Sequence, residues 1–258
     1  MQATDHFFDF AAEVGLTKHL GNVGATDRLA DLCQIKEGDV VLDVGCGSGA
    51  TPVYLAQTRG CHVTGVDILP RMIDRALELA SKKNVSDLTE FRAADAQELP
   101  FPDEQFDAVI TESVTAFPED KGRAVREYAR VLKPGGYVGL NESTWLKTPV
   151  PPEIQAWAAQ EVGATVTPLT QSEWVSLLGE AGLTVRMEEI QEIDIKEEAK
   201  GILARYGFSG MTRILARTFK LYFGNNNYRQ FVKGVRQSGV TPENLTDYFG
   251  YGLYVGRK

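Results

Sequence analysis

The sequence of 258 residues lacks features that several classes of protein require. Its three cysteines, Cys33, Cys46 and Cys61, are an odd number without the spacing of metal ligands, so we expect reduced thiols and no metal site. No apolar run approaches the roughly 20 residues of a membrane-spanning helix. The N-terminus also lacks the basic region and apolar core of a signal peptide. We therefore expect a cytoplasmic protein without an integral membrane segment.

Positive charge is scarce as well. The chain has 27 Lys and Arg against 35 Asp and Glu, a net charge of −8, and no dense basic run. A nucleic-acid surface needs a basic patch, so we expect no nucleic-acid partner and attribute the acidity to solubility. The apolar fraction of 43% is enough for a packed core, and the length suits one α/β domain.

Strand and helix signals alternate from residue 40 onward. Short apolar, β-branched runs are separated by amphipathic runs, which is typical of right-handed crossovers in a largely parallel sheet with helices on both faces. The expected strands are 40–44, 62–67, 88–95, 106–111 and 136–144, and the expected helices are 51–58, 71–83 and 121–132.

The two ends of the chain follow a less regular pattern. Helical signals occupy the first forty residues, and the second half mixes helices with two further strands. The expected elements there are helices over 153–161 and 172–181 and strands over 183–193 and 248–258. More than fifty mostly amphipathic residues separate the last two strands. We therefore expect one domain with a helical insertion at about 196–240.

The run VLDVGCGSGA, residues 41–50, carries the first chemical signal. Gly45, Gly47 and Gly49 lie where a strand should pass into a helix, and glycine allows positive φ and close approach of a ligand. The helix N-terminus adds free N–H groups and partial positive charge. With Ala50 as its last member the run also fits a dinucleotide fingerprint, so the turn alone leaves a nicotinamide-dependent oxidoreductase open. A nucleoside-triphosphate loop is excluded, because its lysine and hydroxyl are absent.

Carboxylates at three expected strand ends narrow the choice of ligand for the glycine turn. Asp43 would repel a pyrophosphate and suits a ligand with an ammonium or sulfonium group, with hydrogen bonding to the turn amides as its other role. Asp67 can accept hydrogen bonds from both hydroxyls of a ribose, with capping of the next helix as the alternative. Asp95 can bind the exocyclic amine of adenine while the N–H of Ala96 meets a ring nitrogen, with a turn role as the alternative. These strand ends meet at one crevice in an open α/β sheet.

The ordered set of motifs resembles the class I S-adenosylmethionine-dependent methyltransferases. Within them it is similar to the type 11 branch that includes quinone-biosynthesis and tocopherol-type C-methyltransferases. The motifs are VLDVGCGSG, VTGVDILPRMIDRA, RAADAQELPFPDEQFDAVIT and REYARVLKPGGYV, between about Val40 and Glu142. The resemblance implies a Rossmann-like α/β fold with a mostly parallel seven-stranded sheet. It also implies methyl transfer from S-adenosyl-L-methionine, which leaves S-adenosyl-L-homocysteine.

The resemblance implies a map of the cofactor site. The glycine turn would face the methionine part of the cofactor. Asp67 would hold the ribose, with Ile68 and Met72 beside the nucleoside, and Asp95 and Ala96 would meet the adenine. The full set of expected cofactor-binding residues is Asp43, Gly45, Cys46, Gly47, Gly49, Asp67, Ile68, Met72, Asp95, Ala96 and Glu112.

The sequence departs from this branch at the expected catalytic position. Many relatives carry a histidine or similar polar group a few residues after "ES", but here residues 115–117 are Thr, Ala and Phe, so no catalytic histidine carries over. His19 and Glu112 remain as candidates. His19 lies in a Gly-rich joint that can fold over the methyl end of the cofactor, with capping of a helix end as the alternative. Glu112 would act as a base or, as we favour, bind the ammonium group of the cofactor.

The single domain of residues 1–258 is expected to have three parts: an N-terminal helical cap at 1–38, a cofactor-binding core at 39–146 and a substrate-side half at 147–258. We hypothesise that the helical insertion forms a lid over the pocket for a small, partly apolar acceptor, with ordinary packing or a homodimer interface as alternatives. A noncatalytic cofactor-binding module remains an alternative function. An NAD(P)-dependent oxidoreductase is the less favoured one, since Asp43 and Asp95 disfavour it.

Overall fold

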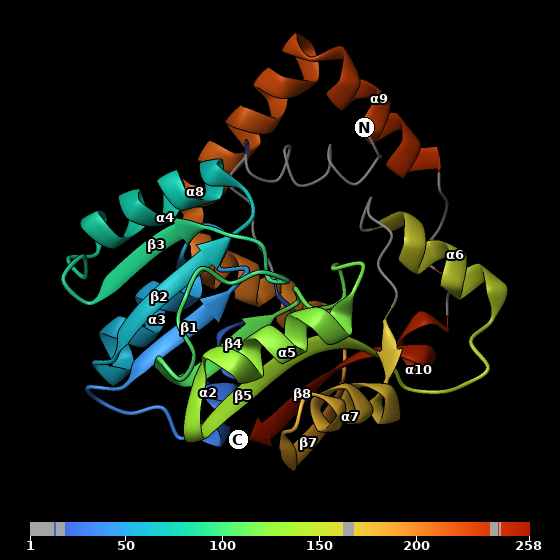
Figure 1. Ribbon diagram of the computed structural model, residues 1–258. Coiled ribbons are helices and arrows are strands. Elements are labelled where there is room, and N and C mark those ends of the chain that lie inside the picture. The colour runs from blue at the N-terminus through green and yellow to red at the C-terminus, as the bar shows by residue number, and fades with distance from the viewer. Residues whose placement is uncertain (1–12, 14–18, 162–167, 238–241, 243) are drawn as a thin grey trace.

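The computed structural model describes residues 13, 19–161, 168–237, 242 and 244–258, which form a sheet flanked by helices (Figure 1). Seven strands follow the order β3-β2-β1-β4-β5-β8-β7, and a two-residue strand, β6, pairs with β5 off this path. The strands are β1 Val40–Val44, β2 His62–Asp67, β3 Thr89–Ala93, β4 Phe106–Glu112, β5 Leu132–Trp145, β6 Leu169–Thr170, β7 Thr184–Glu192 and β8 Phe249–Arg257. The predicted Rossmann-like sheet is confirmed, with β6 as a short addition.

The pairing of the strands brings the expected site to one edge of the sheet. Strands β1 to β5 run parallel to their neighbours, and β8 runs antiparallel to both β5 and β7. Asp43 pairs in register with Gly65, and Asp67 with Ala93. The carboxyl ends of β1, β2 and β3 therefore lie side by side, where open α/β sheets bind ligands.

Helices cover both faces of this sheet. Val41 and Leu42 are neighbours in β1 but belong to different core clusters, as the alternation of side chains along a strand requires. Val41 packs with α2 and α3, whereas Leu42 packs with α5 and α7. The first seven helices of the described residues are α2 Asn22–Leu32, α3 Ala50–Arg59, α4 Pro70–Lys82, α5 Lys121–Val131, α6 Pro152–Glu161, α7 Gln171–Glu180 and α8 Ile195–Gly224.

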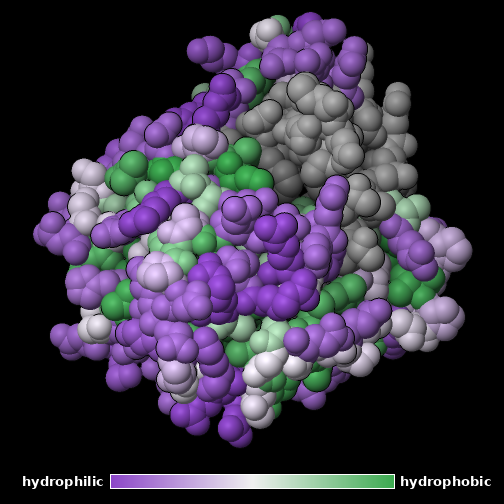
Figure 2. All heavy atoms as spheres, in the orientation of Figure 1, coloured by the Kyte–Doolittle hydropathy of each residue, from purple (hydrophilic) through white to green (hydrophobic). Residues whose placement is uncertain are grey.

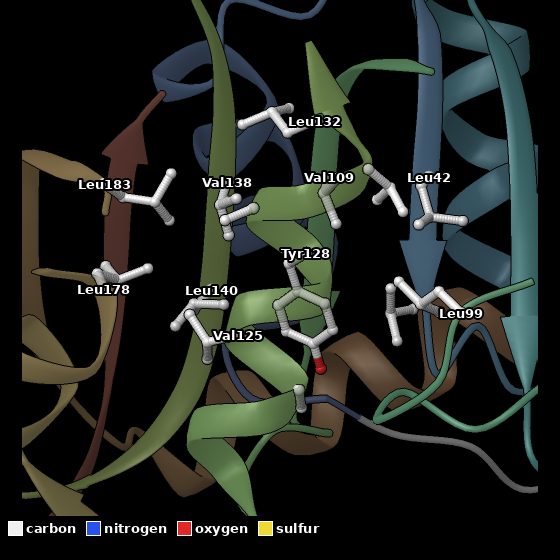
Figure 3. Packing of buried hydrophobic residues seen from close by; sticks show 14 of the residues in the cluster. Leu42, Leu99, Val109, Val125, Tyr128, Leu132, Val138, Leu140, Leu178 and Leu183 are labelled. Atoms are coloured by element: carbon white, nitrogen blue, oxygen red, sulfur yellow. The ribbon is translucent and has the colours of Figure 1, made fainter. Parts of the chain in front are cut away.

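The core on the α5–α7 face is built around an aromatic side chain of α5. Tyr128 is fully buried among apolar residues of β1, β4, β5 and α7 (Figure 3). Its hydroxyl lies 3.5 Å from the hydroxyl of Thr115, which gives the buried polar tip a partner. Burial raises the pKa of Tyr128. This core fixes the loop after β4, which carries Thr115, against the sheet.

The expectation that Asp95 ends the third strand is wrong, because β3 ends at Ala93 and Asp95 lies in the turn that follows. In the second half, the largest difference from expectation is the start of one strand. The expected fifth strand begins at residue 136, but β5 begins at Leu132, because Leu132 already pairs with Phe106 before the register shifts. The predicted insertion lies between β7 and β8, which nevertheless pair directly. It contains α8, which has a kink at Gly207, followed by α9 Asn226–Gln237 and α10 Leu245–Tyr248.

The last long helices, α8 and α9, extend away from the sheet. Figure 1 shows α8 and α9 rising from the sheet and meeting at an apex. The face of the molecule in Figure 2 is hydrophilic over most of its area. Within the described part of the chain, no helix combines the length and the apolar character needed to cross a bilayer. Most of the N-terminal helical segment expected before residue 19 lies outside the described residues.

Candidate active site

The glycine turn joins β1 to α3 and is anchored to the neighbouring strand. The backbone N–H groups of Gly45 and Cys46 both donate to the carbonyl of Val66 in β2, at 2.7 and 2.9 Å. The N–H of Gly49 donates to the carbonyl of Cys46 at 3.0 Å, which closes the turn before α3 begins at Ala50. The turn is therefore held rigidly above the carboxyl ends of β1 and β2, as the sequence predicts.

Two glycines of the turn are required by their surroundings as well as by their backbone. Gly45 and Gly49 have φ of 76° and 81°, a region that L residues with a side chain rarely adopt. A Cβ atom at Gly45 would overlap the side chain of Val114 in the loop after β4. A Cβ atom at Gly49 would lie 2.7 Å from Cβ and 2.9 Å from Cα of Ala76 in α4. These contacts pack the turn against two other elements.

Replacing Gly49 by alanine should lower the free energy of unfolding by roughly 1–3 kcal/mol, because both the left-handed backbone and the contact with α4 oppose a side chain. Chemical denaturation would measure the loss. Gly38→Ala is the matched control, since Gly38 has φ of 82° but nothing within 4 Å of its Cβ position. Equal losses in the two variants would contradict the role of packing against Ala76.

Three carboxylates gather at this turn. Burial and the charges of Glu112 and Asp67 raise the pKa of Asp43 well above its usual range. Among the described residues, no hydrogen bond reaches the Asp43 carboxylate. A pyrophosphate would add negative charge to this cluster, whereas a cationic ligand would relieve the repulsion. The electrostatics therefore favour a ligand with an ammonium or sulfonium group.

Asp67 lies at the end of β2 and braces the turn. Its Oδ2 accepts a hydrogen bond from the N–H of Gly47 at 2.9 Å, and its Oδ1 accepts one from the N–H of Leu69 at 2.9 Å. Burial raises the pKa of Asp67, and these two backbone donors oppose the rise. Each oxygen keeps a further lone pair for a ligand hydroxyl. The alternative role as the N-cap of α4 is not seen, since Leu69 occupies that position.

The expected nucleoside residues have unequal access to a ligand. Ile68 is 66% exposed beside Asp67, whereas Met72 is buried in the first turn of α4. Oδ1 of Asp95 accepts a hydrogen bond from the N–H of Gln97 at 2.8 Å, so the turn role of Asp95 is present. Ala96 is partly buried against the core. Ile68 is thus accessible to a ligand and Asp95 is partly accessible, whereas the side chain of Met72 is not.

Glu112 and His19, the two catalytic candidates, are brought together in a buried cluster. Nδ1 of His19 lies 3.4 Å from Oε1 of Glu112. The hydroxyl of Thr26 donates to Glu112 at 3.0 Å, the hydroxyl of Thr51 at 2.7 Å and the side-chain amide of Asn141 at 3.3 Å. The carboxylate of Glu112 is therefore already engaged by four side chains from separate elements. Glu112 thereby links His19 and α2 to the start of α3, which directly follows the glycine turn.

Glu142, which the sequence does not single out, is a further buried acid near the site. Its Oε1 accepts hydrogen bonds from the N–H groups of Val114 and Thr115 at 3.0 and 2.6 Å. Its Oε2 is buried without a hydrogen-bond partner among the described residues. Burial raises the pKa of Glu142 to about 7. Since Val114 packs against Gly45, Glu142 positions the glycine turn through the loop after β4.

A cavity of about 370 Å³ opens beside the turn, between α2, α3, α4 and α8. Ser48 and Thr51 border it near the turn, and Arg75, Arg213 and Arg217 also border it.

The sequence also led us to expect that Cys46 is not a nucleophile and that no metal site is present. Cys46 is buried and its pKa is raised well above the usual range by burial, so it is a poor nucleophile. Within the described ranges, no three potential metal ligands gather.

Comparisons with known proteins bear on the family of this chain. Residues 42–140 match the family described as a methyltransferase domain. The 27-O-demethylrifamycin SV methyltransferase of Amycolatopsis mediterranei is 39% identical over 160 residues, which are 61% of this chain and 58% of that protein. An uncharacterized protein of Haemophilus influenzae is 32% identical over 215 residues, which are 82% of this chain and 85% of that protein.

Solved structures share the fold. The crystal structure of the MccD protein superposes with a TM-score of 0.69 at 22% identity, covering 93% of this chain and all of that chain. The chain belongs to the class I S-adenosylmethionine-dependent methyltransferases.

Proposed function

We propose that this methyltransferase transfers the methyl group to a small-molecule acceptor with apolar character, and that the residues of the glycine turn hold the cofactor. The observation that carries the cofactor assignment is the cluster of Asp43, Asp67 and Glu112 at a rigid turn. A buried carboxylate without a hydrogen bond from the described residues, at Asp43, fits the cationic end of S-adenosylmethionine. The residues present therefore fit this cofactor better than a dinucleotide.

Each residue has a task in this proposal. Asp67 would accept hydrogen bonds from the ribose hydroxyls, Asp95 and the N–H of Ala96 would meet the adenine, and Ile68 would lie beside the nucleoside. When bound, S-adenosylmethionine would supply an electrophilic methyl carbon with its sulfur as the leaving group. The protein aligns the acceptor and excludes water. A proton, where the acceptor carries one, leaves to solvent or to a base that the described residues do not identify.

Family and charge support a small-molecule acceptor. The chain is acidic, with a net charge of −8, which disfavours a nucleic-acid substrate. The 27-O-demethylrifamycin SV methyltransferase acts on a small molecule by its name, and it shares 39% identity with this chain over 160 residues. The apolar character of the acceptor is inferred from the aromatic residues of the insertion, which we propose to cover the acceptor pocket in part.

Incubating the purified protein with methyl-labelled S-adenosylmethionine and a pooled metabolite extract tests the proposal. We expect label in a small, organic-extractable product, identified by mass, and none when Asp67 is replaced by alanine. Label confined to macromolecules would contradict the small-molecule acceptor. Tight cofactor binding with no transfer to any pool would instead support the noncatalytic module.

A further inference from the structure

The cavity between α2, α3, α4 and α8 has a charge opposite to that of the whole protein. Its volume of about 370 Å³ is typical of a small-molecule site. The charged residues of its described lining are five cations and one acid, which are Arg75, Lys82, Lys83, Arg213, Arg217 and Glu78. The acid already has a partner, because Nζ of Lys82 lies 3.4 Å from Oε2 of Glu78. The cavity is therefore cationic, although the chain has a net charge of −8.

Two arginines of this lining, Arg75 on α4 and Arg217 on α8, carry no ion pair of their own. Among the described residues, no carboxylate oxygen lies within 4 Å of either guanidinium group. The contact of Arg75 is with a backbone group, since its Nη2 donates to the carbonyl of Glu13 at 2.8 Å. Burial and the charge of Arg217 lower the pKa of Arg75, and the charges of Glu78 and Glu13 only partly oppose this fall. An anion bound between the two guanidinium groups would relieve their repulsion.

The start of α3 adds partial positive charge at the end of the cavity near the glycine turn. Ala50 and Thr51, the first two residues of α3, border the cavity. No side chain caps this helix, and their N–H groups donate to no acceptor in the part of the chain that the structure describes. A helix N-terminus of this kind favours an anion. Arginine adds specificity, because its planar fork matches the oxygens of a phosphate in geometry and charge.

Apolar side chains form another part of the lining. Val53 of α3, Leu79 of α4 and Ile214 of α8 border the cavity. Val53 and Ile214 are buried and Leu79 is partly buried, so these side chains belong to the packed interior of the three helices. A bound inorganic anion would leave this apolar lining without a partner. The lining therefore suits a ligand that joins an anionic group to a small apolar body.

We propose that this cavity binds a small organic phosphate. Arg75 and Arg217 would hold the phosphate group, and the apolar lining would contact the body of the ligand. A neutral apolar molecule is a poorer occupant, because it would leave the two guanidinium groups without a counter-charge in the cavity. All of these groups line one cavity, so a single molecule can meet them together.

The cavity adjoins the proposed cofactor site without coinciding with it. Ser48 of the glycine turn borders the cavity, whereas Asp67, Ile68 and Asp95 do not. An organic phosphate would therefore be a second ligand, bound beside the cofactor and next to the same turn. The inference does not rest on the proposed function, because phosphate binding is measured on the protein without cofactor.

Calorimetric titration of the full chain with phenyl phosphate tests the proposal. We expect saturable binding at low salt, at least tenfold tighter than that of inorganic phosphate, and no measurable binding of phenol, which lacks the anionic group. Arg75→Gln with Arg217→Gln should weaken the binding of phenyl phosphate at least tenfold. Arg217→Glu alone should do the same, and because Arg217 is exposed this change leaves the packed core intact.

A matched control removes two cations from another helix. Arg123 and Arg126 are exposed on α5, and Arg123→Gln with Arg126→Gln changes the net charge by the same amount as the double variant of the cavity. This control should bind phenyl phosphate as the wild type does. Arg75→Lys with Arg217→Lys should give an intermediate affinity, because lysine keeps the charge but lacks the planar fork of donors.

Three outcomes would overturn the proposal. The first is that phenyl phosphate does not bind the wild type at low salt. The second is an equal loss of affinity in the cavity variants and in the α5 control, which would reduce the binding to a general attraction of charge. The third is displacement of phenyl phosphate by saturating S-adenosylhomocysteine, which would assign the arginines to the carboxylate of the cofactor. Binding that persists beside S-adenosylhomocysteine supports a second ligand.

Discussion

Replacing Asp67 by alanine is expected to weaken the binding of S-adenosylmethionine by roughly 100-fold or more, the largest effect of any single change at the site. The variant would lose the hydrogen bonds that the Asp67 carboxylate accepts from two ribose hydroxyls, and hydrogen bonds to a charged group contribute about 1.5–3 kcal/mol each. The same change releases the N–H of Gly47, which now donates to Asp67 at 2.9 Å. Both losses act on the cofactor site rather than on the core. Calorimetric titration with S-adenosylhomocysteine measures the change.

The control for this variant lies on the next helix. Asp74 is exposed on α4, seven residues after Asp67, and Asp74→Ala changes the net charge by the same amount. It should leave the affinity within a few-fold of the wild type. Asp67→Asn should fall between the two, because an amide keeps one acceptor oxygen but donates where the carboxylate accepts. Unchanged affinity in Asp67→Ala would refute the proposed map of the cofactor site.

The strands and helices were predictable because the sheet is buried on both faces. Residues 40–44 and 62–67 are short runs rich in valine, and the structure places β1 and β2 at those residues. The glycine turn was equally predictable, since its backbone demands are local to residues 45–49. The start of β5 was not, because the pairing of Leu132 with Phe106 depends on a register shift that no local pattern specifies.

The buried polar clusters could not be predicted, because their members are far apart in the sequence. Thr26, Thr51 and Asn141 all donate to Glu112, across separations of 86, 61 and 29 residues. Each of these residues alone is ordinary, and only the fold brings them together. His19 was a candidate base on its position in a Gly-rich joint, but nothing local indicated that its partner would be Glu112. Sequence patterns report strand ends well and side-chain networks poorly.

Glu142 is another buried residue whose partners are far apart in the sequence. Its ionisation is expected to change the stability of the protein with pH. Burial raises its pKa to about 7 in the folded protein, above the ordinary value of 4.5. Between these two pH values the unfolded chain loses the proton while the folded protein keeps it. The contribution of this group to the free energy of unfolding therefore falls by about 3 kcal/mol as the pH rises from about 4.5 to about 7. Above pH 7 its contribution no longer changes. Asp43 acts in the same direction, because its pKa is raised as well.

Comparison of the wild type with Glu142→Gln isolates the contribution of Glu142, since all other groups titrate in both proteins. The glutamine carbonyl can still accept from the N–H groups of Val114 and Thr115, and its uncharged amide carries no ionisation penalty. We expect the stability of Glu142→Gln relative to wild type to rise by roughly 2–3 kcal/mol between pH 5 and pH 8, measured by urea unfolding.

Glu153→Gln, at an exposed position near the start of α6, should give a difference from wild type that does not change with pH. The Glu142 variant also reports on the site, because the loop that Glu142 holds carries Val114, which packs on Gly45. If ionisation of Glu142 loosens this loop, the affinity of the wild type for S-adenosylhomocysteine should decline above pH 7 and that of Glu142→Gln should not. Stability curves of wild type and Glu142→Gln that run parallel from pH 5 to pH 8 would show that Glu142 is ionised throughout, and hence that its buried Oε2 has a partner in solution.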